Sequence, residues 1–351
     1  MKNLLLFIAL AAAASSSCTE RGVKLSGAGA TFPAPFYNVV CKEYATAGGG
    51  DVSYGGTGSG GGIRSLMDKT VDFGGTDVFL SDAEMLEMGA EVIHVPTAMG
   101  AVALAYNLDG VDSLRLTAQI VSAIYRGEIK TWNDPLLQAV NPDAELPALP
   151  VTPVYRSDGS GTTAVFSEYM STADSIWRIA IGSGKSLSFV AGVAAKGNPG
   201  VAGVIAGTKG AVGYIGSEYA MALSLPSALL RNADGRFVGI ATRSIAASAP
   251  EDMPDDTRIG IVGSEASDAY PIATFTWIIA YKEQSYNGRT QVEARALSDL
   301  LLYIVGDEGQ AIAEKTYYVP LPPTARAKAV AVIRSMTFDG EAVYNSQARV
   351  L

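Results

Sequence analysis

The residues best suited to chemistry lie in one glycine-rich stretch, residues 156–163, which reads Arg-Ser-Asp-Gly-Ser-Gly-Thr-Thr. It follows residues 151–155, which have the composition of a short strand, and precedes residues 164–170, whose apolar positions share one helical face. A helix N-terminus offers unpaired N–H groups and a partial positive charge, and glycines let a ligand approach that backbone closely. Arg156 adds a planar, permanently charged donor group. The stretch predicts an oxyanion site, although a plain helix cap would give a similar sequence.

A second glycine-rich turn, residues 25–35, lies near the start of the chain. Thr31 is predicted to be the N-cap of the helix that follows, with Pro33 or Pro35 in its first turn, where a missing N–H is tolerated. The Thr31 hydroxyl and the Phe32 N–H would then point toward the start of this helix. The turn therefore supplies a second set of donors for the same kind of ligand.

A third turn, residues 55–62, contains the spacing Gly-x-Gly-x-x-Gly, beginning at Gly56. This spacing also occurs in dinucleotide-binding folds, and Asp77 lies near the position of the acid that binds the ribose. That alternative is disfavoured because the strand before Asp77 is interrupted by two glycines, and because the other two turns would have no role. A nicotinamide cofactor is also not expected in an exported protein.

A carboxylate beside an oxyanion site needs a physical reason, since like charges repel. Asp77 has one if the bound anion carries a proton, because an ionised carboxylate only accepts hydrogen bonds. It would pair with the P–O–H group of hydrogen phosphate and reject sulfate, which has no such group. The alternative role for Asp77 is to cap a helix that begins near residue 80.

The two candidates for nucleophilic or metal chemistry, His94 and Cys41, are better explained as core residues. His94 is the single histidine and lies in the apolar run 93–107, with no nucleophile motif nearby. A histidine-based metal site lacks ligands for the same reason. Cys41 lies in a helical pattern and is predicted to be a small buried residue. We therefore expect neither catalytic residues nor a metal or cofactor.

The first residues predict export. Residues 1–17 have the basic start and apolar core of a signal peptide, and Cys18 follows small residues as in a bacterial lipobox, so we expect Cys18 to carry a lipid. Cleavage after the alanines, giving a free protein, is the alternative. No later apolar run is long enough to cross a bilayer. The net charge of −9 argues against nucleic acid or an anionic membrane surface as a partner.

The pattern of elements predicts an α/β protein with two domains, since strands and helices alternate along 351 residues. The run 93–107 is predicted to cross from one lobe to the other. The strong strand pattern at residues 272–281 is predicted to be the return crossing. The later helices are expected at residues 292–305 and 325–336.

In these motifs the chain resembles the phosphate-binding proteins of bacterial high-affinity phosphate ABC transporters. The resemblance covers essentially the whole mature chain. It is carried by residues 27–35, 54–62, 71–77 and 156–162, with support from residues 318–322. It implies a type II periplasmic-binding-protein fold, in which two lobes, each a mixed sheet flanked by helices, close on one phosphate at the hinge cleft. Residues 19–100 and 275–351 would form one lobe, and residues 101–274 the other.

The resemblance also implies a ligand set and partners. The phosphate ligands would be Thr31, Phe32, Ser59, Asp77, Arg156, Ser160, Gly161 and Thr162. Asp158 would hold Arg156 through an ion pair. The expected partners are inorganic phosphate and the transmembrane permease subunits of an ABC transporter with a cytoplasmic ATPase. The protein would be a monomer in the periplasm or on the outer face of the cytoplasmic membrane. Gly60 stands where the family often has a second serine, and Gly55 widens the same turn.

The sequence is also compatible with three other functions. A receptor for another tetrahedral oxyanion would use the same turns without the selection by Asp77. A phosphate-ester hydrolase on this fold would need an added nucleophile or metal cluster, and the sequence contains neither. A surface adhesin or signalling receptor could keep the fold, although the intact ligand positions argue against it.

Overall fold

The computed structural model describes residues 22–344. The predicted signal peptide and Cys18 lie outside this range. Within it, no helix combines the length and the apolar character that crossing a membrane requires. The chain alternates strands and helices, which agrees with the α/β class expected from the sequence.

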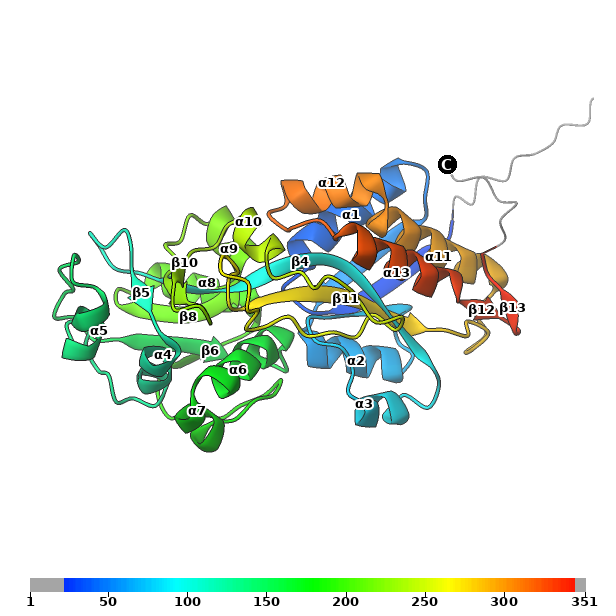
Figure 1. Ribbon diagram of the computed structural model, residues 1–351. Helices are drawn as coiled ribbons and strands as arrows, with labels where there is room; N and C mark the ends of the chain where they lie inside the picture. Colours follow the sequence, from blue (N-terminus) through cyan, green and yellow to red (C-terminus); the bar gives the residue numbers. More distant parts are fainter. Residues whose placement is uncertain (1–21, 345–351) are drawn as a thin grey trace, which may run out of the picture.

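An eight-stranded sheet runs through the whole molecule in the order β2-β1-β3-β11-β4-β8-β6-β7 (Figure 1). Its strands are β1 (Lys24–Gly29), β2 (Asp51–Gly56), β3 (Phe73–Thr76), β4 (Val92–Tyr106), β6 (Thr152–Arg156), β7 (Val193–Ala195), β8 (Ala211–Gly216) and β11 (Ala273–Tyr281). Strands β1, β2 and β3 are parallel to one another, as are β6, β7 and β8. The two parallel groups are the sheets of a first and a second lobe.

Strands β4 and β11 join the two groups. The first part of β4 pairs with β11, from Val92 to Ala101, and its last part pairs with β8, from Val102 onward. Every residue of both strands is buried, as expected of strands that are covered on both faces. The predicted crossing strands are therefore present, and the change of partner within β4 marks the passage between the lobes.

Helices cover both faces of each lobe (Figure 1). The first lobe has α1 (Ala34–Thr46), α11 (Gln291–Val305), α12 (Asp307–Lys315) and α13 (Pro323–Arg334) on one face, and α2 (Ser59–Met67) and α3 (Asp82–Glu87) on the other. The second lobe has α4 (Ala118–Tyr125), α6 (Gly161–Ala173) and α7 (Ser175–Ala180) on one face, and α8 (Gly197–Gly207), α9 (Ser217–Ala222) and α10 (Thr242–Ala246) on the other. The predicted helices at residues 292–305 and 325–336 are thus present as α11 and α13.

Smaller elements close the ends of the molecule. They are α5 (Pro135–Val140), a three-stranded sheet of β5 (Arg115–Leu116), β9 (Leu229–Arg231) and β10 (Phe237–Val238), and the hairpin of β12 (Thr337–Phe338) and β13 (Glu341–Ala342). Local capping fixes several helix starts: Thr117 accepts from Ile120 N–H, and Thr290 forms a reciprocal capping box with Glu293.

His94 and Cys41 are core residues, as the sequence predicted. His94 lies in β4 with 2% of its surface exposed, and its Nε2 accepts a hydrogen bond from Leu80 N–H at 3.1 Å. Burial lowers the pKa of His94 to about 4, so the ring is neutral near pH 7. Cys41 packs in α1 with 4% exposure, and burial raises the pKa of its thiol to about 12. Neither group is placed to act as a base or a nucleophile.

Two helical glycines give a matched test of this packing. A Cβ on Gly62 in α2 would lie 2.5 Å from Gly29 Cα and 2.6 Å from Ala28 O, both backbone atoms of β1. We expect Gly62→Ala to lower the free energy of unfolding by about 1–3 kcal/mol, because backbone cannot move aside cheaply. The control is Gly203→Ala in α8, where a Cβ meets nothing within 4 Å. It should raise stability by about 0.5–1 kcal/mol. Chemical denaturation of both variants measures the difference, and equal effects would contradict the packing described for α2.

Candidate functional site

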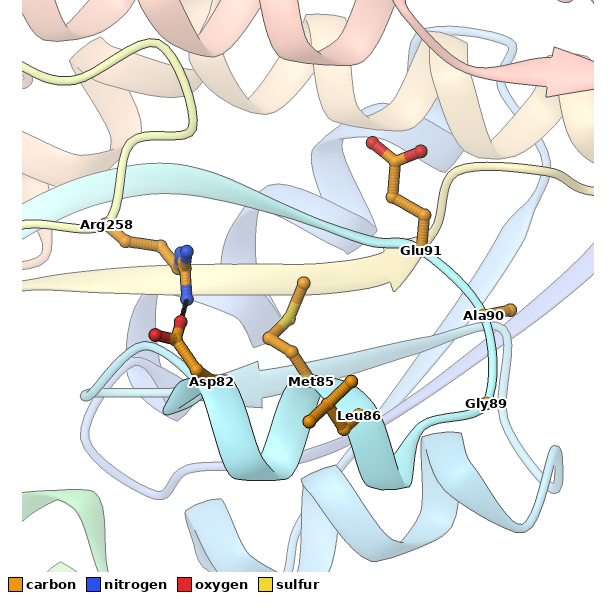
Figure 2. A pocket seen from close by; sticks show the side chains of 7 residues that line it. All are labelled: Asp82, Met85, Leu86, Gly89, Ala90, Glu91 and Arg258. Carbon is orange, nitrogen blue, oxygen red and sulfur yellow. Dashed lines mark hydrogen bonds and ion pairs between the residues drawn. The ribbon is translucent and has the colours of Figure 1, made fainter.

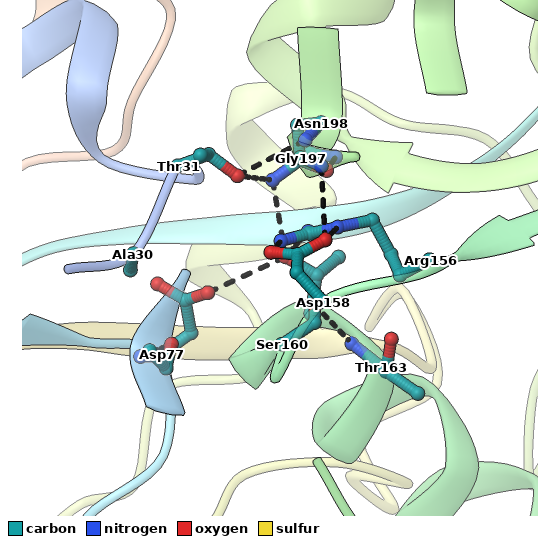
Figure 3. A network of polar contacts seen from close by, with 12 residues as sticks. Ala30, Thr31, Asp77, Arg156, Asp158, Ser160, Thr163, Gly197 and Asn198 are labelled. Carbon is teal, nitrogen blue, oxygen red and sulfur yellow. Dashed lines mark hydrogen bonds and ion pairs between the residues drawn. The ribbon is translucent and has the colours of Figure 1, made fainter. Parts of the chain in front are cut away.

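The predicted ligand residues lie at the carboxyl ends of the parallel strands of both lobes. Thr31, Ser59 and Asp77 follow β1, β2 and β3. Arg156 ends β6, and residues 160–162 lead into α6. Ligands of open α/β sheets bind outside these strand ends. Figure 3 shows the side chains of Thr31 and Asp77 facing those that follow β6 and β7. The structure thus brings the three glycine-rich turns together at the interface between the lobes.

These residues are almost completely removed from solvent. Thr31, Asp77 and Arg156 have 5%, 1% and 5% of their surfaces exposed. Phe32, Ser59, Ser160, Gly161 and Thr162 are also buried. A buried, charged and hydroxyl-rich cluster is unusual in a protein interior, because polar groups cost free energy there unless they are paired. Each of these buried polar groups therefore needs a hydrogen-bond or ion-pair partner.

Asp77 accepts hydrogen bonds from both lobes. Its Oδ2 accepts from Thr162 Oγ1 at 3.3 Å, and its Oδ1 accepts from Thr276 Oγ1 at 3.2 Å. Burial raises the pKa of Asp77 to about 7, although the nearby Arg156 charge opposes this rise. The carboxyl group therefore holds its proton more strongly than an exposed aspartate does.

Arg156 is held by a bidentate ion pair with Asp158. Its Nε lies 2.8 Å from Asp158 Oδ1, and its Nη2 lies 2.5 Å from Oδ2. Burial alone would raise the pKa of Asp158, but its hydrogen bonds with Arg156 and with Gly197 N–H hold that pKa below its ordinary value. Because one edge of the guanidinium is taken, Nη1 is the group left to face the cluster, where it lies 3.5 Å from Thr162 Oγ1. The predicted ion pair of Asp158 is present.

The two lobes are in direct contact around this cluster. Gly60 N–H donates to Gly159 O at 2.9 Å, and Tyr219 Oη donates to Thr31 O at 2.7 Å. A Cβ on Gly161 would lie 2.4 Å from Ser59 Oγ, so only glycine permits this approach. Gly60 replaces the serine that the family often has at this position. Its backbone N–H makes the hydrogen bond to the second lobe, and a Cβ on Gly60 would lie only 3.3 Å from Gly159 Cα. At the rim, Lys185 forms an ion pair with Glu84 of α3.

The remaining predicted ligands are also defined by local contacts. Ser160 is the N-cap of α6, and its Oγ accepts from Thr163 N–H at 3.0 Å. The helix therefore begins at Gly161 and directs its free N–H groups toward the first lobe. The Phe32 ring packs against Tyr318 with ring centroids 6.0 Å apart, which fixes the turn after β1.

One predicted helix cap was wrong, and the alternative role of Asp77 as a cap is not observed. Thr31 is not the N-cap of α1, because that helix begins after Pro33 and has no side-chain cap. The Thr31 hydroxyl is instead bonded to the second lobe, where its Oγ1 accepts from Asn198 N–H at 3.0 Å. Asp77 does not cap α3, because Ser81 does so through a capping box. In both cases a tertiary contact replaced the local one.

Sequence reasoning missed two buried residues beside the cluster. Asn198 in the first turn of α8 is fully buried and donates from Nδ2 to Thr31 Oγ1 and Thr162 Oγ1, each at 3.1 Å. Glu218, just after β8, is 1% exposed, and its carboxyl oxygens have no hydrogen-bond partner among residues 22–344. Burial raises the pKa of Glu218 well above its ordinary value. The available signal was their position: each is polar and follows a parallel strand at the start of a helix.

A separate hollow lies beside α3 (Figure 2). Its volume is about 540 Å³, and it is lined by Asp82, Met85, Leu86, Gly89, Ala90, Glu91 and Arg258. Arg258 and Asp82 form an ion pair of 3.0 Å across it. None of the predicted ligand residues lines this hollow, so it is distinct from the cluster at the lobe interface. Among the described residues there is also no group of acidic, cysteine or histidine side chains that could hold a metal ion.

The raised pKa of Asp77 predicts how stability depends on pH. Between pH 3.8, the ordinary value, and about 7, the folded protein keeps a proton that the unfolded chain has lost. Raising the pH through this window therefore favours unfolding, by up to about 1.4 kcal/mol per pH unit. We expect Asp77→Asn to remove this loss, so that the anion-free variant and wild type agree near pH 4 and diverge toward pH 7. Denaturation curves across this range measure the divergence, and a gap independent of pH would contradict the assignment.

Comparison with known proteins places these features in context. The family model of the PBP superfamily domain matches residues 12–308. Phosphate-binding protein PstS of Xylella fastidiosa is 34% identical over 308 residues, which cover 86% of this chain and 83% of the relative. The PstS of Haemophilus influenzae is 33% identical over 316 residues, covering 89% and 91%. A solved high-affinity periplasmic phosphate-binding protein, PfluDING bound with phosphate, has 22% identity and a TM-score of 0.69, covering 88% of this chain and 93% of its own. That structure shows the shared fold.

Proposed function

This chain belongs to the PBP superfamily and, within it, to the phosphate-binding proteins named PstS, and we propose that it captures inorganic phosphate and passes it to an ABC-type permease. It is a solute-binding protein and not an enzyme. The observation that carries the proposal is the buried carboxyl group of Asp77, which accepts hydrogen bonds from both lobes. Such a site offers many donors for bare phosphate oxygens and one acceptor for a P–O–H group.

The proposed ligand set is the one expected from the sequence. The anion is neutralised by Arg156 and by the N-termini of α2 and α6 rather than by a bulk positive charge, since the chain as a whole carries −9. Donors would come from the hydroxyls of Thr31, Ser59, Ser160 and Thr162, and from the N–H groups of Phe32 and Gly161. Exclusion of water would strengthen each of these bonds.

Asp77 would select a ligand that carries a proton. Its pKa of about 7 in the absence of an anion means that it can lose its proton at little cost near neutral pH. The ionised carboxylate would then accept the P–O–H proton of hydrogen phosphate. Sulfate would place a bare oxygen against that carboxylate, with a lost hydrogen bond and a repulsion between like charges. The second candidate is a receptor for another tetrahedral oxyanion. An anion without a proton would gain nothing from the Asp77 carboxylate, so this residue does not support that candidate.

We propose that closure occurs about the two crossing strands. The lobes would be residues 19–100 with 275–351, and residues 101–274. Gly100 pairs with Thr274, and Ala101 pairs with Ala273, so both boundaries fall at one point of the sheet. Bending there would separate Thr31 and Asp77 from the second lobe. The ion pair of Glu84 and Lys185 would break at the same time.

Localisation and partners follow from the family. PstS proteins are periplasmic, and we propose that this chain is held at the outer face of the cytoplasmic membrane by a lipid on Cys18 after removal of residues 1–17. It would act as a monomer that meets the transmembrane permease subunits of a transporter with a cytoplasmic ATPase. No cofactor or metal is needed for capture and release.

Titration calorimetry on anion-free protein tests the function. We expect phosphate to bind tightly with one site per chain, and excess sulfate to leave that binding unchanged. Asp77→Asn should weaken phosphate binding by about 10- to 100-fold and should let sulfate compete, since the amide can donate to a bare oxygen.

The matched control is Asp158→Asn, which alters a carboxylate of the same network that supports Arg156 instead of facing the ligand. It should weaken phosphate binding without admitting sulfate. Failure of wild type to bind either anion would refute the proposed function. Equal binding of phosphate and sulfate by wild type would leave an oxyanion receptor but remove the selection by Asp77.

A further inference from the structure

Asn198 lies at the centre of the interface without belonging to the proposed ligand set. It is fully buried in the first turn of α8, and Figure 3 shows it beside Thr31 at the end of β7. Its backbone N–H and its Nδ2 donate to Thr31 Oγ1 at 3.0 and 3.1 Å, and Nδ2 also donates to Thr162 Oγ1 at 3.1 Å. One side-chain amide therefore joins a hydroxyl of the first lobe to a hydroxyl of the second.

The orientation of this amide is fixed by its surroundings. Its Oδ1 accepts a hydrogen bond from Gly216 N–H at 3.0 Å. A reversed amide would set its NH2 group against that N–H, donor against donor. The start of α8 is itself anchored, because Gly197 N–H donates to Asp158 Oδ1 at 2.9 Å. The two Nδ2 hydrogens must therefore point at the two threonine hydroxyls.

The consequence appears when the lone pairs of those hydroxyls are counted. A hydroxyl oxygen has two lone pairs and one proton. At Thr31, Asn198 supplies donors to both lone pairs. At Thr162, one lone pair receives Asn198 Nδ2 and the other faces Arg156 Nη1 at 3.5 Å. Each hydroxyl is left with a proton to give and no capacity to accept. Accordingly, Thr162 donates its proton to Asp77 Oδ2.

We propose that Asn198 is a specificity-determining positioning residue that holds the Thr31 and Thr162 hydroxyls as donors only. This rests on the proposed function, since the donors would be directed at bound phosphate. Without Asn198 either hydroxyl could rotate and accept a P–O–H proton, in competition with Asp77. With it, neither hydroxyl can accept that proton, so Asp77 is left as its acceptor. Because it bonds to both lobes, Asn198 also favours closure.

A double-mutant cycle in phosphate affinity tests the mechanism. Asn198→Ala in the wild-type background should weaken binding by about 10- to 100-fold, mainly through faster dissociation. In a Thr31→Val, Thr162→Val background the same change should cost less than about threefold, because the hydroxyls through which Asn198 acts are gone. Equal costs in the two backgrounds would overturn the proposal. Asn198→Leu repeats the cycle if the alanine variant does not fold.

A second variant separates this role from a structural one. Asn198→Asp keeps the shape but replaces the NH2 donors with an acceptor, so both hydroxyls would turn their protons away from the ligand. We expect it to bind phosphate more weakly than Asn198→Ala. A helix start accepts aspartate as readily as asparagine, so a purely structural role predicts the opposite order. Wild-type affinity in Asn198→Asp would therefore contradict the inference.

The control is Asn141→Ala, which removes another buried amide of the second lobe. Its Nδ2 donates to Arg115 O and Leu137 O, and its Oδ1 accepts from Arg115 N–H, so its side chain bonds to no residue of the cluster. It should lower stability in chemical denaturation and leave phosphate affinity unchanged. Wild-type protein is titrated first: no phosphate binding there refutes the proposed function. Normal wild-type binding with an unaffected Asn198→Ala refutes only the role of Asn198.

Discussion

The arrangement of the other polar groups at the lobe interface depends on the buried carboxyl group of Asp77. It lies with 1% exposure opposite Arg156, and burial raises its pKa to about 7 despite that positive charge. A group in this position must be neutralised or bonded whenever the lobes meet. The hydroxyls of Thr162 and Thr276 do so in the structure. A ligand that carries one proton can take over this task, which gives the closed interface a reason to prefer hydrogen phosphate.

The surrounding polar groups are arranged in a hierarchy. Asp158 occupies one edge of Arg156 and also holds the start of α8 through Gly197 N–H, so a single carboxylate orients a guanidinium and a helix. That helix places Asn198, which determines the direction of two hydroxyls. Close contact is possible because the facing backbone is glycine at positions 60, 159 and 161. Asp158 and Asn198 thus position the proposed ligand residues without needing to touch the ligand themselves.

Continuity of the sheet decides how such a site could open. Strand β4 pairs with β11 in the first lobe and with β8 in the second, and both β4 and β11 are buried throughout. The lobes therefore share a core and cannot separate freely. Polar contacts that would break on opening include Gly60 with Gly159 and Glu84 with Lys185. The buried strands form a stiff connection between the lobes, whereas the contacts around the cluster are polar. This combination favours two discrete arrangements of the lobes, open and closed, over a gradual loosening.

The sequence alone determined the main elements and predicted most of the chemistry now proposed. Strand and helix periodicity located β4, β11, α11 and α13, and the glycine-rich turns identified the three helix starts, because these signals are local. The proton argument for Asp77 also needed only residue types. The cap predicted at Thr31 was wrong, since local propensity cannot show that its hydroxyl has a partner in the other lobe. Asn198 was missed for the same reason: β7 and β1 are distant in sequence, and only the closed tertiary structure brings their ends within hydrogen-bonding distance.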